Sequence, residues 1–121
     1  MVKFDMDSDE ARALVDAGFL AVSRNITDAG IAIFEAVVLV RPELAAGYIG
    51  LCYAYLGAGQ PEKAFEVLKK APPGFEIDLF GGIALIRGGD KELGRKRLEH
   101  VLAYSPDVAH KEIAQSFLAE S

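Results

Sequence analysis

Residues 18–37 read GFLAVSRNITDAGIAIFEAV, and the spacing of their small and large side chains recurs twice along the chain. Each copy has two small residues followed by a large apolar one, and shifts of 34 and 64 positions superimpose the copies. The three sets are Gly18, Gly30 and Phe34; Cys52, Ala64 and Leu68; and Gly82, Gly94 and Leu98. Small side chains let two helices cross closely, and large ones interlock beside the crossing. The pattern therefore predicts three pairs of packed helices.

Helix boundaries follow from capping residues, prolines and glycines. We expect N-cap oxygens at Thr27, Asp90 and Ser105. We expect first-turn prolines at Pro42, Pro61 and Pro106, and helix ends at Gly57-Ala58-Gly59 and Gly88-Gly89. Residues 31–40 are rich in β-branched side chains, but their place in the repeat favours a helix over a strand. The predicted helices are 9–23, 27–40, 43–57, 61–70, 76–88, 91–103 and 106–119.

A period of 34 residues with two helices per unit is that of tetratricopeptide repeats, and residues 11–106 resemble such an array. The resemblance implies an all-α fold, a right-handed α-solenoid of three tetratricopeptide-type helix-turn-helix repeats with a C-terminal capping helix. We expect a single domain over residues 1–121 with a flexible start at 1–8. The repeats are expected at about 11–44, 45–74 and 75–105, and the capping helix at about 106–119.

Composition argues against several classes of function. The chain has 121 residues, and its 18 acidic side chains outnumber 13 basic ones without any basic run, so we expect no nucleic-acid partner. The longest apolar stretch, residues 29–40, is interrupted by Glu35 and is shorter than the roughly 20 residues that span a bilayer. The acidic N-terminus does not resemble a secretory signal. We therefore expect a cytoplasmic protein with no membrane insertion.

No constellation of residues predicts catalysis. His100 and His110 have no ligand-type neighbours at metal-binding spacing, so we expect no metal. The single Cys52 occupies a small crossing position and is expected to be a packing residue. The glycine pairs do not follow the pattern of a phosphate-binding loop. With no nucleophile–base pair, the sequence predicts neither an enzyme nor a cofactor.

A second apolar stripe on the first helix of each unit is the candidate site. Its members share the i, i+4, i+7 spacing of one helical face, and the opposite face already carries the packing residues. The stripe consists of Val15, Phe19 and Val22; Ile49, Tyr53 and Leu56; and Leu79, Ile83 and Ile86. One interpretation is a concave groove that receives an apolar helix of another protein. The alternative is that the C-terminal helix or a second copy of the chain buries the stripe.

A narrower resemblance rests on residues 14–20 (LVDAGFL) and on the break at residues 71–74 (APPG). With three short repeats and an apolar groove, these are similar to the small tetratricopeptide chaperones that guard the needle subunit of bacterial type III secretion systems. The resemblance implies a partner-binding chaperone that prevents premature polymerisation of a needle-like subunit, with a second small co-chaperone as a further partner. Groove positions of carboxylate-clamp repeats hold Val15, Phe19, Gly50, Glu76 and Phe80 here, so that mode is not expected.

Two alternatives stay open at this point. One is a general tetratricopeptide scaffold or a self-associating adaptor in another bacterial assembly, for which the apolar Ile33 and Val40 would suit a homodimer face. The other is an enzyme subunit that acts together with a second chain, which no residue pattern favours.

Overall fold

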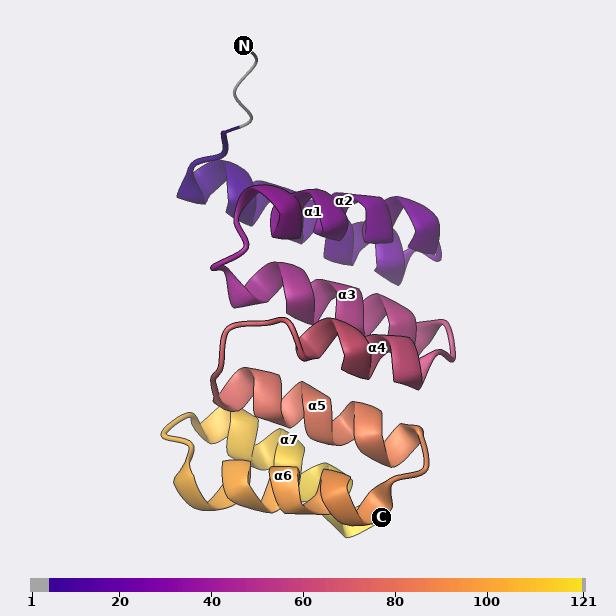
Figure 1. Cartoon of the computed structure of the whole chain (residues 1–121), viewed down its shortest axis with the longest axis vertical. Coiled ribbons are helices and arrows are strands. Elements are labelled where there is room, and N and C mark those ends of the chain that lie inside the picture. The colour runs from indigo at the N-terminus through magenta and orange to yellow at the C-terminus, as the bar shows by residue number, and fades with distance from the viewer. Residues whose placement is uncertain (1–4, 121) are drawn as a thin grey trace.

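The computed structural model describes residues 5–120, and within them the chain forms seven helices and no strand (Figure 1). The helices are α1 (Ser8–Ser23), α2 (Thr27–Val40), α3 (Ala45–Gly57), α4 (Pro61–Leu68), α5 (Phe75–Arg87), α6 (Lys91–Tyr104) and α7 (Val108–Glu120). The predicted all-helical fold is confirmed, including a helix over the β-branched run in α2. The predicted flexible start falls partly on residues 1–4, which lie outside the described residues.

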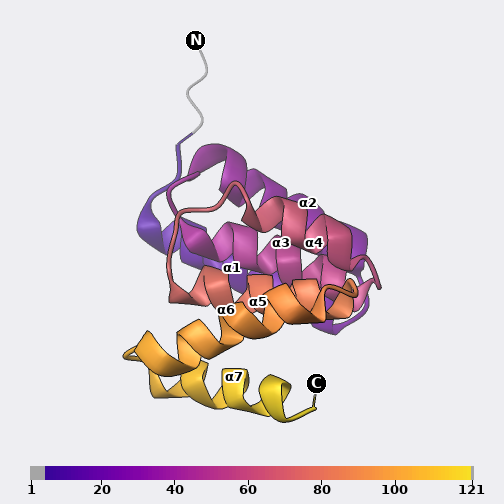
Figure 2. The same ribbon diagram turned by 60° about the horizontal axis from the view of Figure 1, so that its bottom comes forward.

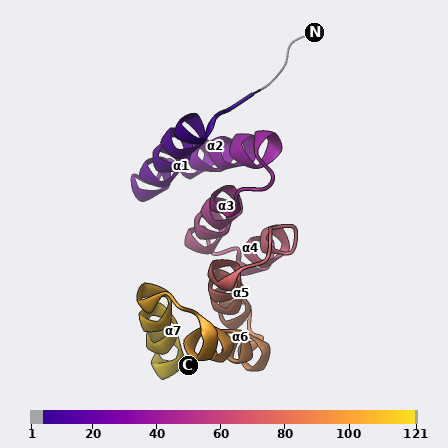
Figure 3. The ribbon, with the colours of Figure 1, turned by 90° about the vertical axis from the view of Figure 1, so that its left-hand side faces the viewer.

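Three helix pairs stack along the long axis of the molecule. The pairs α1–α2, α3–α4 and α5–α6 each pack together, and α7 packs on α6 and α5. Figure 3 shows α1, α3, α5 and α7 on one side of the stack and α2, α4 and α6 on the other. Helix α7 lies at the end of the stack farthest from the N-terminus (Figure 2). The stack therefore has two distinct faces, and α7 belongs to the face of the first helices.

The repeat is visible in the backbone at the turn inside each pair. Asn25, Gly59 and Gly89 have positive φ angles of 63°, 73° and 99°. After each of them the next amide donates to the carbonyl five residues earlier, at 2.8, 2.8 and 2.9 Å. A residue in the left-handed conformation thus lets the next amide bond a free carbonyl at the end of the helix, and the chain reverses direction there. The same turn thus recurs at equivalent positions in all three units.

The two helices of a unit cross where side chains are smallest. A Cβ atom on Gly18 would lie 2.6 Å from the Phe34 ring, and one on Gly82 would lie 2.8 Å from Leu98. Phe34 and Leu98 are fully buried. Gly18 and Gly82 therefore occupy equivalent crossings, as the repeat predicts. In the middle unit Cys52 takes this position, and its side chain is 0% exposed.

Some predicted caps differ from those observed. Asp90 caps α6 as expected, since its carboxylate accepts the Leu93 amide at 3.3 Å. Thr27 is the first residue of α2 and does not cap it, because the first helical carbonyl already belongs to Ile26. Helix α7 begins later than predicted, because the Asp107 carboxylate accepts the His110 amide at 3.2 Å and takes the capping role expected of Ser105.

The prolines also differ from the prediction. Of the three that were expected in the first turn of a helix, only Pro61 lies there. Pro42 and Pro106 precede α3 and α7 instead. These two helices start a few residues farther along than the prolines alone indicate.

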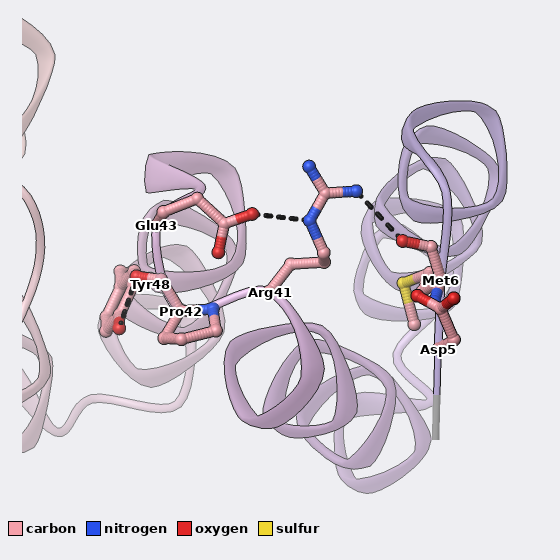
Figure 4. Close-up of polar contacts among 6 residues, drawn as sticks. All are labelled: Asp5, Met6, Arg41, Pro42, Glu43 and Tyr48. Atoms are coloured by element: carbon pink, nitrogen blue, oxygen red, sulfur yellow. Dashed lines mark hydrogen bonds and ion pairs between the residues drawn. The ribbon is translucent and has the colours of Figure 1, made fainter. Parts of the chain in front are cut away.

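The segment before α1 is tied to the α2–α3 turn by Arg41 (Figure 4). The Arg41 guanidinium donates to the Met6 carbonyl at 2.9 Å and also pairs with Glu43. Met6 is buried with Ala11 and Val37 in a small core at this end of the stack. Asp7 caps α1 by accepting the Glu10 amide at 2.8 Å. The chain is therefore anchored from Asp5 onward.

The crossing at Gly82 generates a stability prediction. Gly82→Leu must displace Leu98 and the Gly94 carbonyl, which lies 3.0 Å from the added Cβ, so it should cost about 1–3 kcal/mol by overpacking. Gly57→Leu is the matched control, because nothing lies within 4 Å of a Cβ there. Urea unfolding of both variants measures the difference. Equal stabilities would contradict the close crossing.

Burial of Cys52 generates a prediction about pH. Desolvation raises the pKa of its thiol from 9.0 to about 12. The unfolded chain therefore loses this proton above about pH 9 while the folded chain retains it, and stability falls as pH rises toward 12. Wild type should lose up to about 1.4 kcal/mol per pH unit more than Cys52→Ala in this window. Urea titrations at about pH 8 and pH 10 measure this, and parallel pH dependences would show that Cys52 is not desolvated.

Candidate partner-binding groove

A cavity of about 490 Å³ lies on the face formed by the first helix of each unit and by α7. We name it the groove. Its walls come from the C-terminal halves of α1, α3 and α5, from the α1–α2 turn, and from α7. This volume falls within the range of protein ligand sites. The groove is therefore large enough to hold several side chains of a bound segment.

Four of the predicted stripe residues line the groove, and they come from three different helices. These residues are Val22, Tyr53, Leu56 and Ile83. Tyr53 is the most exposed of the four, at 43%, whereas Val22 and Leu56 are half-buried and Ile83 is buried. The 34-residue register thus brings residues far apart in sequence to one apolar surface.

The other predicted stripe residues lie beside or beneath the groove. Phe19 packs edge-on against Phe34, with ring centroids 5.0 Å apart, and also contacts Tyr53 at 5.5 Å. Val15 packs against the N-terminal core. Ile86 packs on the α5–α6 core and lines a separate small hollow. These three side chains support the groove walls from the interior or extend beyond its ends.

Ile49 and Leu79 are buried in the protein's own core, with 5% and 0% exposure. Leu79 and Ile83 share a core cluster with Ala114 of α7. The C-terminal helix therefore covers the third-unit end of the stripe, which was one of the two interpretations of the pattern. The open part of the stripe is centred on the first and second units.

Sequence reasoning missed the residues of α7 that form the opposite wall. Ile113 and Phe117 line the groove, and Ile113 is 40% exposed. Their i, i+4 spacing places both on one helical face, which is the signal that could have revealed them. Phe80 and Arg87 of α5 complete this side. The capping helix is thus part of the candidate site and not only a lid over the core.

Few of the side chains that line the groove are polar or charged. Among the described residues that line it, Arg87 alone carries a charge, and its guanidinium lies 5.9 Å from the centre of the Phe117 ring. Ser23, Asn25 and Thr27 provide uncharged groups at the α1–α2 end. An apolar occupant matches these walls, because a charged segment would lose solvation without gaining partners.

Polar contacts hold α7 in place as a wall. The His110 ring Nε2 lies 3.3 Å from a Glu76 carboxylate oxygen on α5. The Arg95 guanidinium of α6 donates to the Leu118 carbonyl at 3.2 Å. With Ala114 fully buried between them, these contacts fix both ends of α7. These contacts make α7 a fixed wall of the groove.

The His100 and Cys52 side chains, which could bear chemistry, have packing surroundings in the described residues. Within residues 5–120, no group of three or more His, Cys, Asp or Glu side chains is placed to hold a metal ion. His100 stacks on Phe75 with ring centroids 5.6 Å apart. Cys52 is buried, and its raised pKa disfavours the reactive thiolate. In the same part of the chain, every helix is too short or too polar to cross a membrane.

Comparison with known proteins places the fold. Neither a family model nor a curated protein sequence matches the chain. Among solved structures, the type III secretion translocator chaperone SycD of Yersinia enterocolitica superposes with a TM-score of 0.81 at 15% identity, over 95% of this chain and 92% of SycD. A second SycD structure, an alternative dimer, gives 0.78 at 15% identity over 94% and 92%. The chain therefore has the tetratricopeptide-type helical fold of this secretion chaperone.

Proposed function

We propose that this protein is a chaperone that holds an apolar helix of a secreted partner in the groove. The observation that carries the proposal is the groove itself. Exposed apolar side chains line it on both sides, Tyr53 on α3 and Ile113 on α7. Large apolar side chains exposed together on a small protein are typical of a surface that a partner covers. The proposed role is binding, in the cytoplasm of a bacterium, and not catalysis.

A helix is the occupant that best suits this shape. The walls are themselves helices, α1, α3 and α5 on one side and α7 on the other. An amphipathic helix laid in such a cleft presents its i, i+3, i+4 and i+7 side chains to the apolar floor. Its own backbone hydrogen bonds stay internal, so the groove needs no polar groups at its centre.

The finer proposal is that the partner is a needle-like subunit of a type III secretion system. Two things support it: the resemblance of residues 14–20 and 71–74 to needle-subunit chaperones, and the fold shared with SycD, itself a translocator chaperone. A subunit that polymerises through an apolar helix needs that helix covered before secretion, because exposed apolar helices assemble prematurely. A small co-chaperone that assists the complex is part of the same proposal.

Substitution at the groove centre tests the chaperone role. Tyr53→Glu and Ile113→Glu place a charge in the groove at side chains that are already partly exposed, so both variants should fold. Each should weaken capture of the host's needle subunit by at least about 2 kcal/mol, roughly thirtyfold. Calorimetric titration measures the affinity. Tyr104→Glu is the matched control, since Tyr104 is 69% exposed on α6, outside the groove.

Sedimentation of filaments gives the functional readout. Wild type should keep the needle subunit in the supernatant, and the two groove variants should let filaments form. The same titration with the host's translocator proteins separates the finer proposal from the broader one, because tight binding of a translocator alone would reject the needle subunit. Groove variants that fold and bind either partner unchanged would reject the groove as the binding site.

A further inference from the structure

Among the described residues that line the groove, the one charge lies at one end. Ser23, Gly57 and Arg87 occupy equivalent positions in the three units, because shifts of 34 and 64 residues superimpose them, and all three line the groove. Ser23 and Gly57 bring no charge to the first and second units. Arg87 is the last residue of α5 and places a cation at the third-unit end. The two ends of the groove therefore differ in charge.

Arg87 lies on the groove side of α5. Phe80, Ile83 and Arg87 follow the i, i+3, i+7 spacing of one helical face, and all three line the groove. The Arg87 guanidinium lies 5.9 Å from the centre of the Phe117 ring on α7, within reach of a cation–π contact. A guanidinium over a ring face still offers N–H donors at its edge. The contact thus holds a cation beside the groove without using up its donors.

A second hollow continues the groove beyond Arg87. It has a volume of about 240 Å³, and it shares Arg87 and Phe117 with the groove. Its other lining residues are Ile86, Lys91 and Glu120. Lys91 is the first residue of α6 and is exposed. Two cations and one carboxylate therefore surround this end of the groove, which leaves it with a net positive charge.

The acidic residues near these cations are engaged elsewhere. Glu92, beside Lys91, is paired with Lys96 at 3.7 Å. The Asp90 carboxylate accepts an amide at the start of α6 at 3.3 Å. Within the part of the chain that the structure describes, neither Arg87 nor Lys91 takes part in an ion pair. The positive end of the groove is therefore available to a carboxylate from another chain.

The carboxyl-terminal end of a helix matches this positive end. A helix carries partial negative charge at that end, where cations stabilise it. A guanidinium also binds a carboxylate through two parallel N–H···O bonds. The walls of the groove offer a partner to one such charge and otherwise take apolar side chains. An apolar helix with a carboxylate in its last turn therefore fits both features.

The opposite end of the groove suits the other end of the same helix. The first N–H groups of a helix have no acceptor within the helix. Ser23, Asn25 and Thr27 line the groove at the α1–α2 turn, and their side-chain oxygens are of the types that accept such amides. The two ends of the groove thus agree on one direction for a bound helix.

We propose that Arg87, assisted by Lys91, binds a carboxylate in the last turn of the partner helix and so determines which helices the groove accepts and in which direction. The inference rests on the function proposed above and specifies its ligand. The carboxylate belongs to an Asp or Glu side chain or to the carboxyl terminus of the partner, which share the same chemistry. The carboxylate-clamp positions hold no cation in this chain, so Arg87 acts from a different place.

Calorimetric titration with the host's needle subunit tests the proposal, or with a translocator if that is the protein that wild type binds. Arg87→Gln should weaken binding about tenfold, because the carboxylate loses charge-assisted hydrogen bonds. Arg24→Gln is the matched control, since Arg24 directly follows α1, is exposed and does not line the groove. Added salt should weaken the binding of wild type more than that of Arg87→Gln, which a purely structural role of Arg87 would not cause.

Variants of the partner identify the source of the carboxylate. In one set each Asp or Glu of the partner's helices is replaced in turn by Asn or Gln, and in another the carboxyl terminus is amidated. The change that removes the bound carboxylate should weaken wild-type binding about tenfold and leave binding by Arg87→Gln unchanged, because the two groups act as one pair. Circular dichroism verifies that each variant is folded.

Equal affinities of wild type and Arg87→Gln would overturn the proposal and leave the groove as the binding site. An Arg87→Gln protein that binds every partner variant more weakly by the same factor would also overturn it, because Arg87 would then act only by holding Phe117. A wild-type chain that binds neither the needle subunit nor a translocator would reject the proposed function and this inference together.

Discussion

Close approach of two helix backbones is the constraint on which the rest of this structure depends. A Cβ on Gly94 would lie 2.7 Å from the Gly82 carbonyl oxygen, and one on Gly30 would lie 3.1 Å from the Gly18 carbonyl oxygen. No larger residue fits at these crossings without moving the helices apart. Where the helices cross closely, the Phe34 and Leu98 side chains pack beside the crossing and are fully buried. The left-handed turns at Asn25, Gly59 and Gly89 then return the chain within a few residues, so each unit repeats the same turn, and Cys52 and Ala64 take the crossing positions of the middle unit.

Close helix crossings require small residues at a regular spacing, and both the size and the spacing can be read from the sequence. Most of the fold could therefore be predicted. The small residues defined the register, and the register placed Val22, Tyr53 and Leu56 on one surface, with Ile83 buried beneath it at 4% exposure. Ile49 and Leu79 have the same spacing but lie in the core, since an apolar stripe has the same pattern whether a neighbouring helix covers it or not. Ile113 and Phe117 escaped prediction because α7 has no repeat partner from which its orientation could be read. Caps were the least predictable feature, since Asp107 and Ser105 are equally suitable by residue type.

The stack has two faces with apolar hollows, and different residues line each of them. The groove lies on the first helices of the units and α7, whereas two further hollows lie along α2, α4 and one side of α3. Leu51 and Tyr53 show how a single helix serves both, since residues two apart on a helix point in different directions. Half of the chain is hydrophobic, at 51%, and this division accounts for apolar side chains that the small core does not need. Apolar side chains that the core leaves open are typical of surfaces that a partner covers.

The proposed occupant of the groove between α3, α5 and α7 is an apolar helix of a partner. Methyl-labelled NMR of the chain during titration with the needle subunit tests it most directly, because isoleucine and leucine methyls report on both faces in one spectrum. Intermolecular contacts and the largest shifts are expected at Leu56 and Ile113, whereas the methyls of Leu39, which is 81% exposed at the end of α2, should be unchanged by the partner. Shifts confined to Leu39 and Leu51, with the groove methyls unmoved at saturation, would contradict it.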